Sequence, residues 1–497
     1  MKIAAFDIGT TAVKGVLVEE SGVWLDQMSV DITTYYEEDR KEQDPLEWYG
    51  AFCSISQKFT EKYGADDIGA IVMSGQMQDM IPVDKNLNPV GRAVLYSDGR
   101  AGAEADGICA ALGQNGEDGR KYVERITGNH YDGSLTFPKV LWMKRLLPGE
   151  FEKVHKILIS SKDYVIARLT GQFCTDVTAA STAGLMDIHE KKWDGRMLEE
   201  AGVGMSLFPE IQYAHEEAGR VTEKAAEETG YRAGTGVFAG TGDAGATTLA
   251  SGIAETGEYN INLGTSGWVA TVSDDVFSAS GGVFNLAAMP RGRYINVVPF
   301  LNAGNVHKWV TGIFAGGPDG RDYEKMNGIL EKSVPGSHGV LFLPYLSGER
   351  FPVMDAQIKG GYYGISPETT REDLSRSCLE GVAFSIRQGI ESIGVLPKKI
   401  SVIGGGGRVK VWCQILADVL GAPLYVYKNA EMLPSAAIAS SVLLGMGKIK
   451  SYREFTDGLQ KEENSTCFLP DPETEEMYRK QYELYKKLYP AACMVRG

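Results

Sequence analysis

The fold is decided by an N-terminal stretch that reads Lys2-Ile3-Ala4-Ala5-Phe6-Asp7-Ile8-Gly9-Thr10-Thr11-Ala12-Val13-Lys14-Gly15-Val16-Leu17-Val18. Apolar runs on both sides of the polar segment predict a strand, a tight turn and a second strand. Gly9 lets the turn close, and backbone N–H groups in such a turn can bind an anion beside the two threonine hydroxyls. Asp7 could hold a divalent metal at the end of the first strand. The stretch predicts a phosphate and metal site, although a hairpin without a ligand fits it equally well.

The same pattern returns in the middle of the chain. Residues 258–272 read Glu258-Tyr259-Asn260-Ile261-Asn262-Leu263-Gly264-Thr265-Ser266-Gly267-Trp268-Val269-Ala270-Thr271-Val272, again a strand, a turn and a strand. Two similar hairpins half a chain apart indicate a duplicated architecture with a cleft between its halves. Two anion-binding turns that face each other would suit a polyphosphate.

Length and composition narrow the class of protein. A chain of 497 residues predicts two large domains, and a net charge of -15 argues against nucleic acid or an anionic membrane as partner. No apolar run is long enough to span a bilayer, and no leader precedes the first strand. The seven cysteines are scattered singly, which favours a reduced, cytoplasmic protein without structural zinc.

Strands that alternate with helices predict an α/β protein, with the domain boundary near residue 247. We therefore expect domains at 1–246 and 247–497. Ile68 to Gly75 is predicted to be a buried strand, and its end delivers Met77 and Gln78 to the edge where α/β proteins bind ligands.

The segment Gly240-Thr241-Gly242-Asp243-Ala244-Gly245 matches the dinucleotide-binding fingerprint between a strand and a helix. No ribose-binding acid follows on a next strand, because the chain enters the second hairpin instead. Asp243 is either the cap of a helix or a carboxylate that takes a proton from a hydroxyl. We favour the base, because a cap alone would not need three glycines around it. A dehydrogenase remains an alternative that depends on this segment alone.

Gly404 to Gly407 lie between a predicted strand and a predicted helix, where a nucleotide could approach the bare backbone. A flexible turn is the simpler alternative. The sequence contains no P-loop motif, and its spacing suggests no Ser-His-Asp or Cys-His arrangement.

Taken together, these motifs resemble the FGGY family of carbohydrate kinases, and within it the xylulokinases. Asp7 to Thr11 with Lys14 is similar to the family's first phosphate motif, and Asn262 to Gly267 to its second. Further matches are Ile403 to Arg408 for the adenosine motif, Ser134 to Trp142 for the first signature, Gly360 to Ile365 with Asp373-Leu374 and Leu379-Glu380 for the second, and Leu343 to Arg350 for xylulokinase-like sequence.

The resemblance implies two actin-like (ribonuclease H-like) domains that close on ATP and a sugar. It implies that Asp243 is the catalytic base, that Asp7 and Asp243 serve Mg²⁺, and that Met77, Gln78 and Asp243 contact the sugar. The first domain would bind the sugar and phosphate, and the second domain would bind the nucleotide. A homodimer is plausible from the family. The nucleotide-binding residues that it implies are Gly9, Thr10, Thr11, Lys14, Gly264, Thr265, Ser266, Gly304, Gly405, Gly406 and Lys410.

Two positions depart from the xylulokinase pattern, which usually has His where Gln78 stands and Asn where Ala244 stands. Both lie next to the expected sugar, so the resemblance implies the reaction more firmly than the substrate. Xylulose is our first expectation, with ribulose, gluconate or an alditol as alternatives. An actin-fold regulatory ATPase would share the phosphate turns, but we would expect a peptide-binding module after them.

Overall fold

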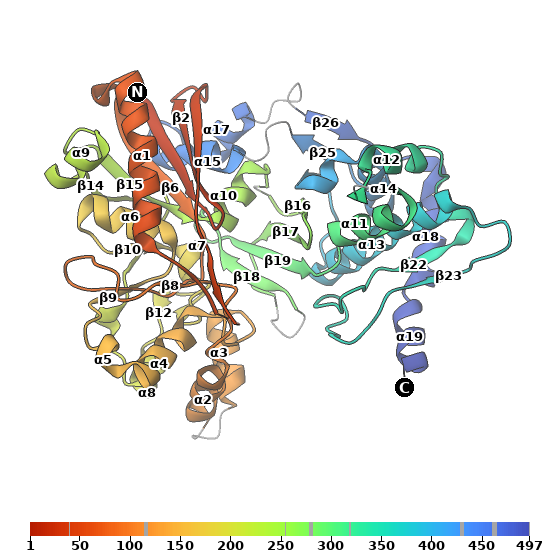
Figure 1. Cartoon of the computed structure of the whole chain (residues 1–497), viewed down its shortest axis with the longest axis horizontal. Coiled ribbons are helices and arrows are strands. Elements are labelled where there is room, and N and C mark those ends of the chain that lie inside the picture. Colours follow the sequence, from red (N-terminus) through yellow and green to blue (C-terminus); the bar gives the residue numbers. More distant parts are fainter. Residues whose placement is uncertain are drawn as a thin grey trace.

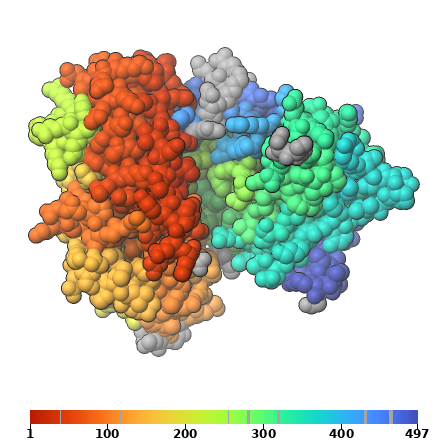
Figure 2. Space-filling model, in the orientation of Figure 1, coloured from red at the N-terminus to blue at the C-terminus, as the bar shows by residue number. Residues whose placement is uncertain are grey.

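The computed structural model describes residues 1–38, 40–113, 118–253, 255–277, 282–317, 320–427, 432–459 and 465–496. They form two lobes, each built on a mixed β-sheet with helices packed on it (Figure 1). A furrow runs between the lobes on the face that Figure 2 shows.

The first sheet has the strand order β14-β15-β6-β1-β2-β3. Its strands are β1 (Lys2–Ile8), β2 (Ala12–Glu19), β3 (Trp24–Asp31), β6 (Ile68–Gly75), β14 (Glu217–Arg220) and β15 (Gly236–Gly242). β1 to β3 form an antiparallel meander, β6 runs parallel to both β1 and β15, and β14 is antiparallel to β15. The carboxyl ends of β1, β6 and β15 therefore lie at one edge of the sheet.

The second sheet repeats this arrangement in the order β18-β19-β17-β16-β24-β25-β26. Its strands are β16 (Glu258–Leu263), β17 (Gly267–Ser273), β18 (Phe284–Ala287), β19 (Tyr294–Phe300), β24 (Lys399–Ile403), β25 (Leu424–Tyr427) and β26 (Ser465–Phe468). β16, β17 and β19 form the meander, β24 is parallel to β16 and β25, and β26 is antiparallel to β25. The two sheets thus share a topology, and the predicted duplication of an α/β, actin-like unit is confirmed.

The helices of the first lobe cover both faces of its sheet and build an extension below it (Figure 1). On α1, Asp44 caps the helix by accepting a hydrogen bond of 2.9 Å from the N–H of Leu46, with Pro45 at the first position. These helices are α1 (Pro45–Tyr63), α2 (Gly102–Leu112), α3 (Gly119–Thr127), α4 (Thr136–Leu146), α5 (Pro148–Phe151), α6 (Ser161–Thr170), α7 (Val177–Ala180), α8 (Gly195–Ala201), α9 (Glu223–Thr229) and α10 (Asp243–Ala250).

The later helices do not all stay with the second sheet. Residues 433–459 return to the first lobe, where Ile438, Val442, Leu443 and Phe455 pack with buried residues of β1, β2 and β6. Figure 1 shows α15 and α17 there, blue beside the red strands. The helices are α11 (Gly304–Phe314), α12 (Tyr323–Leu330), α13 (Arg371–Ile393), α14 (Lys410–Leu420), α15 (Leu433–Ala437), α16 (Ala439–Gly445), α17 (Tyr452–Leu459), α18 (Pro472–Tyr485) and α19 (Leu488–Arg496).

Short strands complete the described chain: β4 (Tyr35–Glu37), β5 (Arg40–Gln43), β7 (Ile81–Val83), β8 (Ala93–Val94), β9 (Lys156–Leu158), β10 (Cys174–Asp176), β11 (Met186–Asp187), β12 (Lys192–Trp193), β13 (Glu210–Gln212), β20 (Gly316–Gly317), β21 (Gly320–Arg321), β22 (Leu341–Leu343) and β23 (Gly361–Tyr363). Among the described residues, no helix combines the length and the apolarity that crossing a membrane requires.

Candidate active site

The turn between β1 and β2 is closed by the N–H of Gly9, which donates to the carbonyl of Ala12 at 3.1 Å. Asp7 lies at the end of β1 and accepts a hydrogen bond of 2.9 Å from the Ser74 hydroxyl on β6. Burial raises the pKa of Asp7, while the bond from Ser74 and the charge of Lys14 oppose that shift. The sequence-predicted turn therefore carries a carboxylate that the protein alone solvates poorly.

A buried amide network holds Thr10 in this turn. The Thr10 hydroxyl donates to Gln76 at 2.8 Å, and the Gln43 amide donates to the Thr10 carbonyl at 2.6 Å. Gln43 also accepts from the Gln76 amide at 2.8 Å and from the Trp48 indole at 3.0 Å. Both glutamines are almost fully buried, so these bonds fix the turn in a low-dielectric setting where breaking one is costly.

Asp243 is the first residue of α10, at the carboxyl end of β15. The N-cap residue is Gly242, and no side chain caps this helix, so Asp243 is not its cap. Water reaches the carboxylate, yet the surrounding protein raises its pKa to about 7. Desolvation is the largest cause, and the charge of Asp7 adds to it. An accessible carboxylate with this pKa can exchange a proton with a bound hydroxyl near neutral pH.

The three glycines around Asp243 have packing reasons of their own. A Cβ on Gly240, whose φ is 62°, would lie 1.8 Å from the Met73 carbonyl on β6. A Cβ on Gly242 would lie 1.9 Å from the Met77 sulfur, and one on Gly245 would lie 2.3 Å from the Thr241 hydroxyl. The glycines allow β15 and α10 to pack closely, so our argument that they clear space for a base is wrong.

A buried ion cluster supports the end of β15. Lys162, which is fully buried, pairs with Asp163 at 2.7 Å and with Asp176 at 3.1 Å. The other oxygen of Asp176 accepts a hydrogen bond of 3.1 Å from Thr241, two residues before Asp243. Because a broken buried pair leaves an uncompensated charge, this cluster restricts where Asp243 can lie.

On the side of the predicted sugar, Met77 packs against Gly242, and Gln78 donates to the Ser134 hydroxyl at 2.8 Å. Gln78 has a φ of 65°, a conformation that few residues other than glycine adopt. The ammonium of Lys139 donates to the Gln78 carbonyl at 3.1 Å and so holds this unusual backbone.

Asp79 is a buried carboxylate in the same region. One oxygen accepts from the N–H of Tyr96 at 3.0 Å, and the other has no hydrogen-bond partner within the part of the chain that the structure describes. Desolvation raises the pKa of Asp79 well above its usual range, opposed by Lys139, and the charge of Asp243 raises it further. Asp7, Asp79 and Asp243 therefore share one electrostatic environment.

The second turn, Gly264 to Ser266, joins β16 to β17 and contacts the start of α11. The N–H of Gly304 donates to the Gly264 carbonyl at 2.8 Å, and the N–H of Asn305 donates to the Thr265 carbonyl at 2.9 Å. A Cβ on Gly304 would lie 2.2 Å from the Gly264 carbonyl oxygen, so only glycine fits. The side chains of Thr265 and Ser266 are exposed.

The glycines after β24 lie against the same turn. A Cβ on Gly404 would lie 2.8 Å from the Leu263 carbonyl oxygen, and one on Gly406 would lie 2.6 Å from the Leu263 Cβ. Gly405 instead faces open space, and Lys410 is exposed at the start of α14. Of the predicted set, Gly264, Gly304 and Gly405 thus border one accessible surface, whereas Gly406 is needed for packing.

The acids fit a magnesium ion only in part. Within the described ranges, no group of three or more His, Cys, Asp or Glu side chains could hold a metal ion. Asp7 and Asp243 raise the local negative charge, which a divalent cation would offset. Mg²⁺ commonly binds one or two carboxylates and completes its shell with water and substrate phosphates. Two acids beside a phosphate turn are consistent with that mode.

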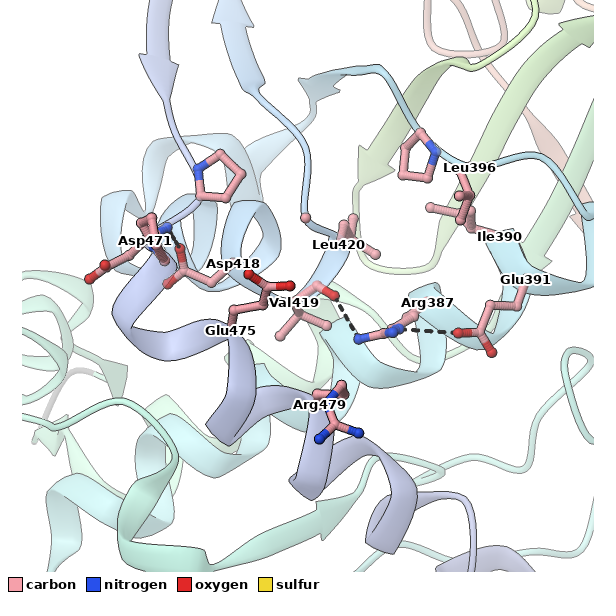
Figure 3. Close-up of a pocket in the computed structure, with 14 residues that line it drawn as sticks. Arg387, Ile390, Glu391, Leu396, Asp418, Val419, Leu420, Asp471, Glu475 and Arg479 are labelled. Carbon is pink, nitrogen blue, oxygen red and sulfur yellow. Dashed lines mark hydrogen bonds and ion pairs between the residues drawn. The ribbon is translucent and has the colours of Figure 1, made fainter.

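The hollow in Figure 3 is separate from this site. It has a volume of about 270 Å³ and lies in the second lobe between α13, α14 and α18. Arg387 crosses it, donating to the Val419 carbonyl at 3.2 Å and pairing with Glu391 at 3.1 Å. None of our predicted site residues lines it.

Comparison with known sequences identifies the architecture. The N-terminal domain of the FGGY family of carbohydrate kinases matches residues 2–250, and its C-terminal domain matches residues 259–437. The chain belongs to this family. It is therefore a sugar kinase, a class of enzyme that uses ATP, and the family resemblance of its motifs is confirmed.

Individual members of the FGGY family are similar over nearly the whole chain. The xylulose kinase of Staphylococcus xylosus is 26% identical over 494 residues, covering 98% of this chain and 99% of its own. The gluconokinase of Bacillus subtilis is 26% identical over 466 residues, covering 91% and 89%. The crystal structure of xylulose kinase from Rhodospirillum rubrum superposes with a TM-score of 0.88 at 24% identity, covering 99% of each chain, which confirms the fold.

The raised pKa of Asp243 predicts how stability depends on pH in this FGGY kinase. The folded state holds the proton up to about pH 7, and the unfolded state releases it near 3.8, the ordinary pKa of an aspartate, so ionisation destabilises the fold as pH rises between these values. We expect Asp243→Asn, which cannot ionise, to have a higher Tm than the wild type at pH 8 without nucleotide, and the difference to shrink toward pH 5. Thermal unfolding from pH 5 to 8 measures it, with Asp66→Asn at an exposed carboxylate as control. A difference that does not change with pH would contradict the assignment.

Proposed function

We propose that this sugar kinase transfers the γ-phosphoryl group of ATP to a primary hydroxyl of xylulose, with Asp243 as the base. One observation carries the proposal: a water-accessible carboxylate with a pKa of about 7 lies beside the phosphate-type turn of the first lobe. In this reaction the sugar oxygen attacks phosphorus, its proton passes to Asp243, and ADP leaves.

Asp243 suits this role because its pKa of about 7 lies near neutral pH, where a general base is most effective. Asp176, which pairs with Lys162, accepts a hydrogen bond from the hydroxyl of Thr241, two residues before Asp243. Met77 packs against Gly242, the residue directly before Asp243. The two residues that precede the base are therefore held by buried contacts, which favours the accurate positioning that proton transfer requires.

The two turns would bind the phosphates. In the first lobe, the donors would be the backbone N–H groups of Thr10 and Thr11 and the hydroxyl of the exposed Thr11, while Gly9, whose own N–H bonds to Ala12, closes the turn. Gly264 to Ser266 would supply the donors of the second lobe. We assign Lys14, Gly304, Gly405, Gly406 and Lys410 to the same nucleotide region. Asp7 would hold magnesium, which supplies charge neutralisation on the phosphates when bound. Closure of the lobes would exclude water, which otherwise competes with the sugar hydroxyl.

Xylulose is our first choice because several full-length relatives are named xylulose kinase. The charged side chains that perturb Asp243 are carboxylates, which disfavours an anionic sugar acid close to the base. Gluconate is the second candidate, because a gluconokinase is about as similar. The amide of Gln78 and the methyl group of Ala244 would contact the sugar differently from the His and Asn expected there.

We also propose that the domain of residues 1–246 binds the sugar and phosphate and that the domain of residues 247–497 binds the nucleotide. A homodimer and a cytoplasmic location remain predictions from the sequence.

Removing the carboxylate tests the base directly. We expect Asp243→Ala to lower kcat by about 10²–10⁴-fold, because the hydroxyl proton loses its acceptor. Binding of a non-hydrolysable ATP analogue, measured by calorimetry, should persist. Asp66→Ala serves as a control for removal of an exposed acid. A variant with undiminished kcat would show that Asp243 is not the base.

A substrate panel tests the sugar. We expect kcat/KM to be highest for xylulose among ketoses, aldoses, alditols and gluconate, measured by coupled ADP release. Higher kcat/KM for gluconate or an alditol would replace xylulose while leaving the kinase assignment intact.

A further inference from the structure

A cavity of about 610 Å³ lies between the lobes, on the part of α10 beyond Asp243. We call it the inter-lobe cavity. Gly245, Thr248 and Leu249 of α10 form one wall, and Val272 of β17 and Ile295 of β19 form another. α16 and α17 complete it, and Figure 1 shows α17 near α10 between the two lobes. This volume is typical of sites that bind small metabolites.

The wall is apolar, whereas the rim is cationic. Among the described residues that line the cavity, Arg291, Arg293, Lys450 and Arg453 are basic and one, Glu255, is acidic. That balance is opposite to the net charge of -15 on the whole chain. An apolar wall with several cations matches an organic anion that has an apolar body.

The cations differ in how they are paired. Arg291 lies 3.1 Å from Glu216, and Arg293 lies 3.0 Å from Asp274. Arg453 lies 2.8 Å from Glu255, 3.5 Å from Glu258 and 3.6 Å from Asp457, so Lys450 is the cation that carries the site. The Lys450 side chain is exposed, and its ammonium makes no ion pair or hydrogen bond with any residue that the structure describes. It can therefore meet an anion without breaking an existing pair.

The inter-lobe cavity is lined by one element from each side of the proposed active site, α10 and β17. α10 begins with Asp243, and β17 begins directly after the second phosphate-type turn. α16 packs on the first sheet, while β17 and β19 belong to the second. A ligand here would touch both lobes, so its affinity must depend on how they are oriented.

We propose that the inter-lobe cavity binds a small organic anion with an apolar body and that this ligand is coupled to nucleotide binding. The coupling rests on the proposed function, since it requires the cleft to bind ATP. By linkage, nucleotide must then change the affinity of the cavity by the same factor as the ligand changes that of the cleft.

The probe is 8-anilinonaphthalene-1-sulfonate, an aromatic anion whose fluorescence reports binding. With the cleft saturated by a non-hydrolysable ATP analogue, we expect one saturable site on the full chain. Lys450→Glu should weaken this binding about tenfold, and Leu444→Trp, which fills part of the half-buried wall, should also weaken it. Lys487→Glu, an equal charge change away from the cavity, should leave the Kd unchanged.

No saturable binding, or the same Kd in wild type, Lys450→Glu and Leu444→Trp, would overturn the site. Omitting the ATP analogue should change the Kd of the probe by about fivefold or more, and an unchanged Kd would overturn the coupling. Failure to phosphorylate any sugar would instead overturn the proposed function, because probe binding does not depend on turnover.

Discussion

The structure depends on the way the first sheet holds two like charges near each other. Asp7 is the second-last residue of β1, and Asp243 directly follows β15. Both strands lie next to β6 and run parallel to it. Two strand spacings separate them, roughly 10 Å along the sheet. The Ser74 hydroxyl donates a hydrogen bond to Asp7, and the hydroxyl of Thr241, two residues before Asp243, donates one to Asp176. In the proposed mechanism, a bound cation and the proton of the sugar hydroxyl would relieve this charge.

Local signals in the sequence predicted much of this arrangement. The hairpin at Asp7 to Thr11 and its repeat at Gly264 to Ser266 are short patterns whose physics is local, and the structure contains them. The buried bonds of Gln43 and the ion cluster of Lys162 were not predicted, because their partners lie far away in the sequence. The three glycines around Asp243 do not identify a base, because the close packing of β15 and of the start of α10 requires glycine at the same positions.

The return of residues 433–459 to the first sheet was also invisible in the sequence. Helices that pack on either sheet have similar apolar stripes, so periodicity does not say which sheet they cover. This return ties the lobes together behind α10. The helix that begins with Asp243 also lines the inter-lobe cavity, which is why we propose that the two sites are coupled.

The central claim is that turns from both lobes hold one triphosphate. Hydrogen–deuterium exchange of the whole chain, with and without a non-hydrolysable ATP analogue and Mg²⁺, tests it most directly. We predict that the amides of Thr10 and Thr11 in the first turn and of Gly264 to Ser266 in the second both become protected when the nucleotide binds. Protection of only one turn, or of neither while the nucleotide is bound, would contradict the account.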